Sequence, residues 1–333
     1  MNSPRVTVAM AVYNVAPFIG EAVRSVLEQP FQDFELLAVN DGSTDGSGEI
    51  LRAFDDRRIR VLDQENQGIA RTRNRLLSEA LGEYIAVFDP DDVMLPGRLA
   101  RQSDLLCRQA DIGIVGGQVI QIAEDGYELS RCVTYPTGAL AIHERCTDPR
   151  MSILHGTSMF RASIARELGG YREAFGSIQE DFEFFSRILS KHPGANLSCP
   201  VIKYRLRRSS AVGAHSDFMP KRVELVKRQF ARMRAGGAEL SGEEFVELQR
   251  SDGDLARRNA ASNILVVSPE SRYWSRVGRA ALRGRQWSVA RRSYVKSLVA
   301  APHNWVPYAG VVRSFLHAGG GQACEPGAVQ SRK

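Results

Sequence analysis

The first hundred residues alternate between apolar segments typical of buried strands and segments with the spacing of amphipathic helices. Apolar runs occupy residues 5–14, 34–40, 58–63 and 83–88, and each is followed by a stretch whose apolar residues recur at helical spacing. Parallel strands need long crossover connections of this kind, whereas antiparallel strands can be joined by short turns. The pattern therefore predicts an α/β fold with a mostly parallel sheet and helices on both faces.

Polar turns follow three of these predicted strands. Tyr13 and Asn14 end the first strand, residues 40–45 (NDGSTD) end the second, and residues 89–92 (DPDD) end the fourth. Ligands of open parallel sheets bind beyond the carboxyl ends of the strands, so we expect one crevice to collect all three turns.

The turn DPDD places three carboxylates within four positions, directly behind a buried strand. One aspartate would be enough to cap the helix that follows. A hard divalent cation that is bound mainly by substrate phosphates needs one or two protein carboxylates, and the excess of carboxylates favours such a metal site. The turn also resembles the nucleophile loop of haloacid-dehalogenase-like phosphatases. That family carries the loop on its opening strand, and here two complete βα units precede it.

Five motifs in a fixed order are similar to those of the family 2 glycosyltransferases, which are inverting, nucleotide-sugar-dependent enzymes of the GT-A fold. They are AVYN, VNDGSTDGS, ENQGIARTRN, FDPDD and QEDFEFFSRIL. The resemblance covers residues 5–208 and implies a GT-A catalytic domain over residues 1–210. It implies transfer of one sugar from a nucleotide-diphosphate sugar, with UDP or dTDP favoured, to the hydroxyl of a glycan, lipid-linked glycan or protein. Surface polysaccharide or glycoconjugate synthesis would be the setting.

The resemblance also implies which residues bind the nucleotide. Tyr13 would stack on the base, a task that suits an aromatic face. Asp41 would accept a hydrogen bond from the ring N–H of uracil or thymine. Arg71 would lie near the base or the diphosphate, although a solvated helical arginine explains it nearly as well. The full implied set is Ala11, Tyr13, Asn14, Asp41, Gly42, Arg71 and Asp89.

The metal and the base follow from the same resemblance. Asp89 would bind the ribose or support the metal, Asp91 would ligate Mn²⁺ or Mg²⁺, and Asp92 is the candidate for a plain helix cap. The acceptor hydroxyl must lose a proton as it attacks, and Asp181 in QED is the expected base. Glu180 would bind the acceptor or orient the loop. The alternative for this pair is an acidic first helical turn that complements the helix dipole.

The segment HGTSMFRAS resembles the family strand between the metal loop and the base. His155, Gly156 and Met159 would then shape the sugar or acceptor pocket. A histidine that merely starts a strand explains His155 equally well.

The segment YRLRRSSAVGAH resembles a loop that often closes over the diphosphate in this family. Arg205, Arg208, Ser210 or His215 could contact phosphate there, and the sequence does not choose among them. The QxxRW motif of processive polysaccharide synthases is absent after the ED pair, which favours transfer of a single sugar.

The remainder of the chain has helical patterns. We expect a helical region over residues 211–318 and a disordered tail over residues 319–333. Within it, tetratricopeptide spacing is matched by Trp274, Gly278, Ala290, Tyr294 and Pro302. One such hairpin cannot bury its own apolar face, so it should stack on neighbouring helices or on the catalytic domain.

The net charge of +6 and the pI of about 9.2 favour an anionic partner. Aromatic residues do not interleave with the basic clusters, so nucleic acid is not expected, and peripheral membrane contact through basic helices is the second interpretation.

Five cysteines, odd in number and without CxxC spacing, predict a reducing cytoplasm, with the inner face of the membrane as a variant. The alternative to an enzyme is a non-catalytic GT-A-fold protein that acts through its helical tail.

Overall fold

The computed structural model describes residues 3–133, 135–145, 152–175, 180–208, 219–238, 244, 268–302 and 306–316. The chain divides into two compact units, Met1–Ile264 and Leu265–Lys333, and each is described by itself.

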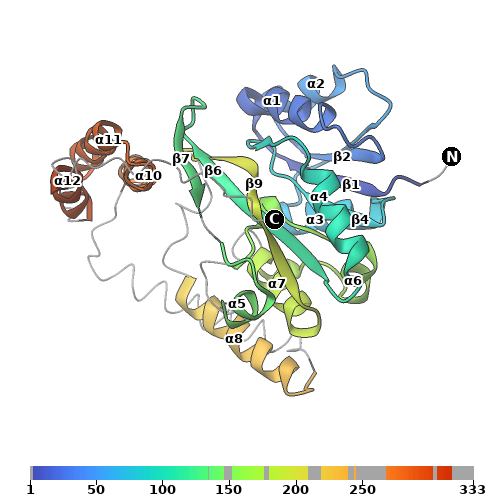
Figure 1. Ribbon diagram of the computed structural model, residues 1–333. Coiled ribbons are helices and arrows are strands. Elements are labelled where there is room, and N and C mark those ends of the chain that lie inside the picture. The colour runs from blue at the N-terminus through green and yellow to red at the C-terminus, as the bar shows by residue number, and fades with distance from the viewer. Residues whose placement is uncertain are drawn as a thin grey trace, which may run out of the picture. The chain divides into compact units, whose positions relative to one another are not determined.

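In the N-terminal unit the described strands form one nine-stranded sheet (Figure 1). The strands are β1 (Val6–Val12), β2 (Phe34–Asp41), β3 (Ile59–Gln64), β4 (Tyr84–Val87), β5 (Val93–Met94), β6 (Ile114–Ile122), β7 (Glu128–Val133), β8 (Met159–Arg161) and β9 (Gly194–Arg205). The helices are α1 (Ala16–Leu27), α2 (Ser47–Arg52), α3 (Ile69–Glu79), α4 (Arg98–Arg108), α5 (Ala139–Arg145), α6 (Ala162–Glu167), α7 (Glu180–Lys191) and α8 (Met219–Arg234). Two 3₁₀ turns, η1 (His155–Thr157) and η2 (Glu173–Phe175), complete the unit.

The strand order is β3-β2-β1-β4-β8-β6-β9-β5, with β7 paired to β6. Strands β3, β2, β1 and β4 run parallel, as the alternating sequence pattern predicts. Beyond β4 the sheet is mixed: β8 is antiparallel to both β4 and β6, whereas β6 and β9 are parallel. The predicted α/β fold is confirmed, and the parallel part is limited to the N-terminal strands and the β6–β9 pair.

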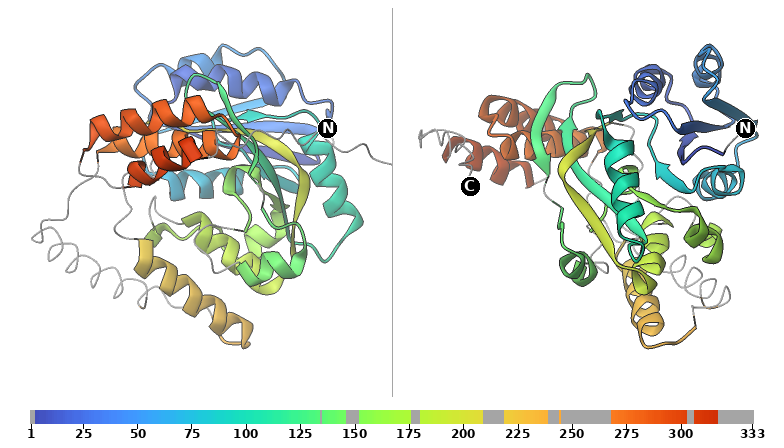
Figure 2. Two further views of the ribbon diagram at one scale, coloured as in Figure 1. Left: turned by 60° about the vertical axis from the view of Figure 1, so that its left-hand side comes forward. Right: turned by 45° about the vertical axis from the view of Figure 1, so that its right-hand side comes forward.

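Helices cover both faces of the sheet (Figure 2). Alternate residues of β1 point to opposite faces, as in any strand. Val8 and Met10 pack in the core shared with α1, α2 and α4, whereas Ala9 packs in the core shared with α3, α6 and α7. Each connecting helix therefore buries one apolar face against the sheet. Because β1, β2 and β4 are parallel, their carboxyl ends lie at one edge of the sheet.

Helix α8 packs against α7 and belongs to the N-terminal unit. Gln229 of α8 donates its side-chain amide to Glu183 of α7 at 2.8 Å. Glu183 is fully buried and also forms an ion pair with the buried Arg187 one turn later, at 2.8 Å. A buried ion pair costs less free energy when its remaining hydrogen-bonding groups are satisfied, and Gln229 contributes to that.

The C-terminal unit contains α10 (Pro269–Arg283), α11 (Trp287–Ala300) and α12 (Val306–Leu316). Ser268 caps α10 by accepting a hydrogen bond from the Ser271 amide at 3.2 Å. Gly278 and Gly310 lie against the ring of Tyr294, where an added Cβ would come within 2.9 Å and 2.3 Å of ring atoms. A helical C-terminal region is confirmed within the described residues, and its predicted bounds of 211–318 stay a prediction. Its assignment as a tetratricopeptide hairpin is not confirmed, and residues 319–333 lie outside the described residues.

Among the residues that the structure describes, no helix is both long enough and apolar enough to span a bilayer.

Candidate active site

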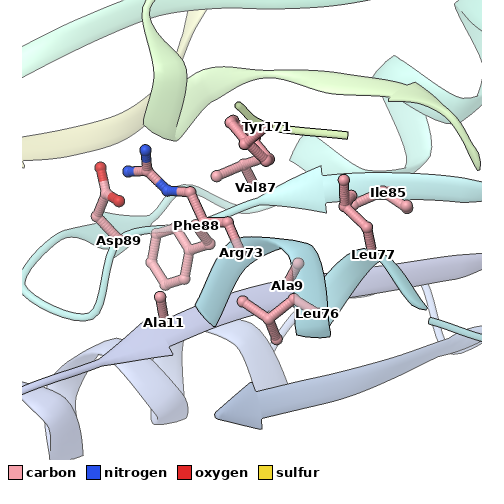
Figure 3. A pocket seen from close by; sticks show the side chains of 10 residues that line it. All are labelled: Ala9, Ala11, Arg73, Leu76, Leu77, Ile85, Val87, Phe88, Asp89 and Tyr171. Atoms are coloured by element: carbon pink, nitrogen blue, oxygen red, sulfur yellow. The ribbon is translucent and has the colours of Figure 1, made fainter. Parts of the chain in front are cut away.

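The loop between β4 and β5 carries Asp89 into a small pocket at the carboxyl edge of the sheet (Figure 3). The backbone amide of Phe88 donates to Ala9 on β1 at 3.1 Å, which ties the start of the loop to the sheet. The polar end of the pocket is formed by Asp89 and the guanidinium of Arg73, beside Tyr171. Its walls are Ala9, Ala11, Leu76, Leu77, Ile85, Val87 and Phe88.

Burial raises the pKa of the Asp89 carboxyl to about 6. The charge of Arg73 lowers this pKa, whereas the charges of Asp91 and Asp181 raise it. The charge of Arg98 also lowers this pKa, so Asp89 feels two cations and two carboxylates besides its burial.

Asp92 is buried, and its Oδ1 accepts the backbone amide of Arg205 at 2.8 Å. Burial raises its pKa well above the ordinary value, and the charges of Asp91 and Asp89 add to this. The prediction that Asp92 caps the following helix is wrong, because α4 begins at Arg98 with Gly97 as its cap. Asp92 instead joins the loop to β9.

Asp91 forms an ion pair with Arg207, whose Nη1 donates to Oδ2 at 2.9 Å. The backbone carbonyl of Asp91 accepts a hydrogen bond from Arg205 at 2.7 Å. The sequence motifs point to Arg205 and Arg208 in this segment; Arg205 contacts the backbone of Asp91, whereas Arg207 contacts its carboxylate. Ser210 and His215 lie outside the described residues.

Two observations bear on whether this loop suits a divalent cation. Asp92 Oδ2 is buried and has no hydrogen-bond partner, which is costly for a carboxylate oxygen. A Cβ added to Gly156 would lie 2.7 Å from Asp89 Oδ2 and 3.4 Å from Asp92 Oδ2, so both oxygens face one point. Within the described residues no three His, Cys, Asp or Glu side chains are grouped to hold a metal. A cation that also binds substrate phosphates needs fewer, so the residues fit.

Arg98 supports the loop from beneath and was not predicted from the sequence. It is 1% exposed, and its guanidinium donates to the carbonyls of Gly156 at 2.9 Å and Val87 at 2.7 Å. Burial lowers its pKa to about 9, against the charges of Asp92 and Asp89. Arg98 therefore holds the backbone at Val87, just before the carboxylate loop, and at Gly156, which lies against that loop.

The predicted base lies in the first turn of α7. Glu180, the first residue of the helix, is 5% exposed and forms an ion pair with Arg73 of α3. Burial raises the pKa of Glu180 to about 7, the charge of Arg73 lowers it, and the charge of Asp181 raises it. Asp181 is half-buried and accepts the Phe182 amide at 2.7 Å. Gln179 lies outside the described residues.

The pocket residues predicted around HGTSM have different surroundings. His155 is buried, stacks on Phe185 and contacts the Tyr171 hydroxyl at 3.0 Å. Burial lowers its pKa well below the ordinary value, with Arg73 and Arg98 adding to the effect. Met159 is fully buried in the core, so a contact with sugar would require that core to open. Gly156 alone of the three lies against the carboxylate loop.

Asp41 is buried at the end of β2 and holds the start of α3. It accepts the backbone amides of Gln67 at 2.8 Å and Gly68 at 3.0 Å, and the side chain of Gln64 at 2.7 Å. Gly42 follows with φ +72°, and an added Cβ would lie 2.8 Å from the Asn66 amide. Glycine is therefore required at this position.

Of the other predicted nucleotide-binding residues, Tyr13 and Asn14 lie in the turn after β1, and Arg71 lies on α3. Asn14 has φ +50°, its amide donates to Ser43 at 3.1 Å, and its side chain accepts from Thr44 at 2.9 Å. These bonds bring the turns after β1 and β2 together, as expected. Tyr13 is 51% exposed, which leaves its ring accessible. Arg71 forms an exposed ion pair with Glu173 at 2.8 Å.

Comparison with known proteins agrees with this geometry. Residues 7–169 match the model of glycosyl transferase family 2. The chain is 32% identical over 213 residues to "Putative glycosyltransferase EpsE" of Bacillus subtilis, covering 62% of this chain and 74% of that protein. The chain therefore belongs to glycosyl transferase family 2, and it is a glycosyltransferase.

Solved structures show the same fold. The Staphylococcus aureus TarS fragment 1–349 in complex with UDP-GlcNAc has a TM-score of 0.57 at 17% identity, over 94% of this chain and 92% of that one. The mannosyltransferase PcManGT of Pyrobaculum calidifontis, in complex with GDP-Man and Mn²⁺, has a TM-score of 0.51 at 16% identity, over 95% and 81%. At these identities the likeness establishes the GT-A fold.

Proposed function

We propose that this glycosyltransferase moves one sugar, in a metal-dependent and inverting reaction, from a nucleotide-diphosphate sugar to an acceptor hydroxyl. The observation that carries the proposal is the position of Arg73, which lines one pocket with Asp89 and forms an ion pair with Glu180, the residue directly before Asp181. Surface polysaccharide or glycoconjugate synthesis is the proposed setting.

The donor would lie along the turns after β1, β2 and β4. Tyr13 offers an exposed ring for the base. Asp41 already accepts three hydrogen bonds, so a uracil or thymine N–H would use its remaining lone pair. UDP or dTDP is the proposed nucleotide. Among structural neighbours, TarS was solved with UDP-GlcNAc and PcManGT with GDP-Man, which supports a nucleotide-sugar donor.

Asp91 and Asp89 are the proposed ligands of Mn²⁺ or Mg²⁺, with Asp92 Oδ2 adjacent. A divalent cation there would supply Lewis-acid neutralisation of the diphosphate leaving group. The Mn²⁺ complex of the neighbour PcManGT supports this choice.

Asp181 is the proposed general base. In an inverting transfer, the acceptor oxygen forms a bond to C1 while the bond from C1 to the diphosphate oxygen breaks, and the nucleoside diphosphate leaves with that electron pair. The acceptor proton passes to the Asp181 carboxylate. Glu180 is held by Arg73 and is better suited to orient this turn than to take the proton.

The decisive experiment measures donor binding and sugar transfer separately. A thermal-shift screen of nucleotide sugars with Mn²⁺ identifies the donor, because a ligand stabilises the folded state by mass action. D181N should then bind that donor as the wild type does and lose transfer by about 10²-fold or more. Normal transfer by both D181N and D91N would refute the proposed roles. Binding of the donor without any transfer or hydrolysis would favour a non-catalytic scaffold. Contact of the basic helices with a membrane surface stays a prediction.

A further inference from the structure

Arg207 forms an ion pair with Asp91, which is a predicted metal ligand. Its guanidinium donates to Asp91 Oδ2 at 2.9 Å. The side chains of Arg207 and Asp91 are 16% and 21% exposed, so solvent screens this pair less than a surface pair. An ion pair of this kind occupies one of the oxygens that a cation at Asp91 would use.

The position of Arg207 follows from the way β9 ends against the carboxylate loop. Arg205, the last residue of β9, is tied to the loop by its backbone amide on Asp92 and its side chain on the Asp91 carbonyl. The guanidinium groups of Arg205 and Arg207 both lie over the ring of Phe18, at 5.1 Å and 5.3 Å from its centroid. Phe18 thus supports Arg207 where it reaches Asp91.

The charge balance of the loop shows what this contact does. Asp89, Asp91 and Asp92 repel one another, and their charges raise the pKa values of Asp89 and Asp92. Arg98 lies beneath the loop and is fixed by backbone carbonyls. Arg207 lies on the side of Asp91, where it compensates the charge of that carboxylate. A cation that binds Asp91 through Oδ2 competes with the guanidinium for that oxygen.

We propose that Arg207 competes with the divalent cation for Asp91, which weakens binding of the metal alone. The inference rests on the proposed function, in which Asp91 holds the metal. When the cation takes Asp91, the displaced guanidinium becomes available to an anion. The diphosphate of the donor is an anion that reaches this place, so metal and donor are favoured to bind together. Arg207 acts as a positioning residue for this order of binding.

The test uses Mn²⁺ alone as the probe, with the full chain and no nucleotide. Electron paramagnetic resonance of free Mn²⁺ gives the dissociation constant without any activity measurement. R207Q should bind Mn²⁺ roughly tenfold more tightly than the wild type, the size expected for loss of a partly buried competing ion pair. R207K keeps the charge but not the planar fork, so its gain should be smaller and in the same direction.

R208Q is the matched control for net charge. It removes one positive charge at the next residue, where Arg208 lies 3.5 Å from Glu124 and is 57% exposed. Its Mn²⁺ affinity should stay close to that of the wild type, because an exposed charge is screened. A gain in R208Q equal to that in R207Q would reduce the effect to net charge and overturn the inference.

D91N separates the inference from the function on which it rests. If D91N keeps the wild-type Mn²⁺ affinity, Asp91 is not a metal ligand and that part of the proposed function fails. If D91N loses Mn²⁺ while R207Q binds it no more tightly than the wild type, the ligand stands and the competition by Arg207 is wrong. Should circular dichroism show R207Q unfolded, the same comparison is made with R207K, where equal or weaker binding overturns the inference.

Discussion

Arg73 on α3 forms an ion pair with Glu180 at the first residue of α7, so the helix that lines the pocket of Asp89 also holds the helix of the predicted base. The same helix is bound twice more to the segment before α7. Asn74 exchanges two hydrogen bonds with the backbone of Tyr171, at 2.8 Å and 2.7 Å, and Arg71 pairs with Glu173. Asp41 in turn holds the start of α3. Helix α3 thus connects Asp41, proposed to bind the nucleotide, with the turn that carries the proposed base.

Replacing Arg73 with glutamine should shift the pH dependence of transfer. Glu180 has a pKa of about 7, and the charge of Arg73 lowers it, so removal of that charge raises it further. More of the enzyme then carries a protonated Glu180 at neutral pH. We expect the rate to fall by about tenfold and its acidic limb to move to higher pH. Initial rates across the neutral range, with the donor saturating, measure both.

R73K is the matched variant, since it keeps the charge but not the geometry of the guanidinium. Its acidic limb should stay near that of the wild type even if its rate falls. An R73Q profile that superimposes on the wild type would show that Arg73 does not control the ionisation of this turn.

Replacing Asp89 with asparagine should stabilise the protein in the absence of donor and metal. The folded-state pKa of about 6 lies above the ordinary value of 3.8, so the folded state binds the proton more tightly than the unfolded state. The neutral carboxyl therefore contributes its full stabilisation to the folded state at pH values below 3.8. This contribution is lost as the pH rises through about 6. Asparagine carries no charge at any pH, and D89N should be more stable at neutral pH by about 1–2 kcal/mol.

Urea unfolding of the metal-free chain at neutral and at acidic pH measures this difference. It should vanish in acid, where the wild-type carboxyl is neutral. D89N should also bind the donor more weakly. A variant less stable than the wild type at neutral pH would show that the attraction of Asp89 to Arg73 and Arg98 outweighs the cost of its burial.

Much of the N-terminal unit could be predicted because its pattern is local. Strand periodicity gave β1 to β4, and α7 covers the expected EDFEFFSRILSK at residues 180–191. Arg73, Arg98 and Arg207 were missed for a common reason. An arginine on an amphipathic segment looks the same in the sequence whether its guanidinium is solvated or forms a hydrogen bond inside the protein. Only the packing of distant elements decides this, as for Arg98 against the carbonyl of Gly156.

The segment HGTSM shows a second limit. The sequence likens HGTSMFRAS to a family strand, whereas the structure has a 3₁₀ turn at residues 155–157 before the short strand β8. Because side chains alternate along a strand, one irregular turn decides which of them face the core. Met159 consequently lies in the core, and Gly156 lies against Asp89.

Replacing Gly156 with alanine should damage the carboxylate loop without a general loss of fold. The new Cβ would lie 2.7 Å from Asp89 Oδ2 and 3.4 Å from Asp92 Oδ2. Asp89 must move, so donor binding and transfer should each fall by about tenfold or more, with a modest stability loss of about 1 kcal/mol. G138A is the control, because nothing lies within 4 Å of a Cβ there. Equal donor affinity in G156A and G138A would contradict the close contact with Asp89.

Asp41 should prove to be structural and nucleotide-binding at once, and two variants separate the roles. D41A leaves the amides of Gln67 and Gly68 without their acceptor and should destabilise the chain by about 1–3 kcal/mol. D45N is the control: exposed Asp45 accepts the amides of Ala16 at 2.9 Å and Ser47 at 3.0 Å, and because asparagine keeps an acceptor oxygen this change should cost less. Urea unfolding without ligand ranks the stability of the two variants.

At temperatures where both variants are folded, calorimetric titration with UDP and GDP then tests base recognition. Loss of a preference for UDP in D41A, but not in D45N, is the expected result. A D41A variant as stable as D45N would mean that the contacts of Asp41 with the start of α3 contribute little to stability.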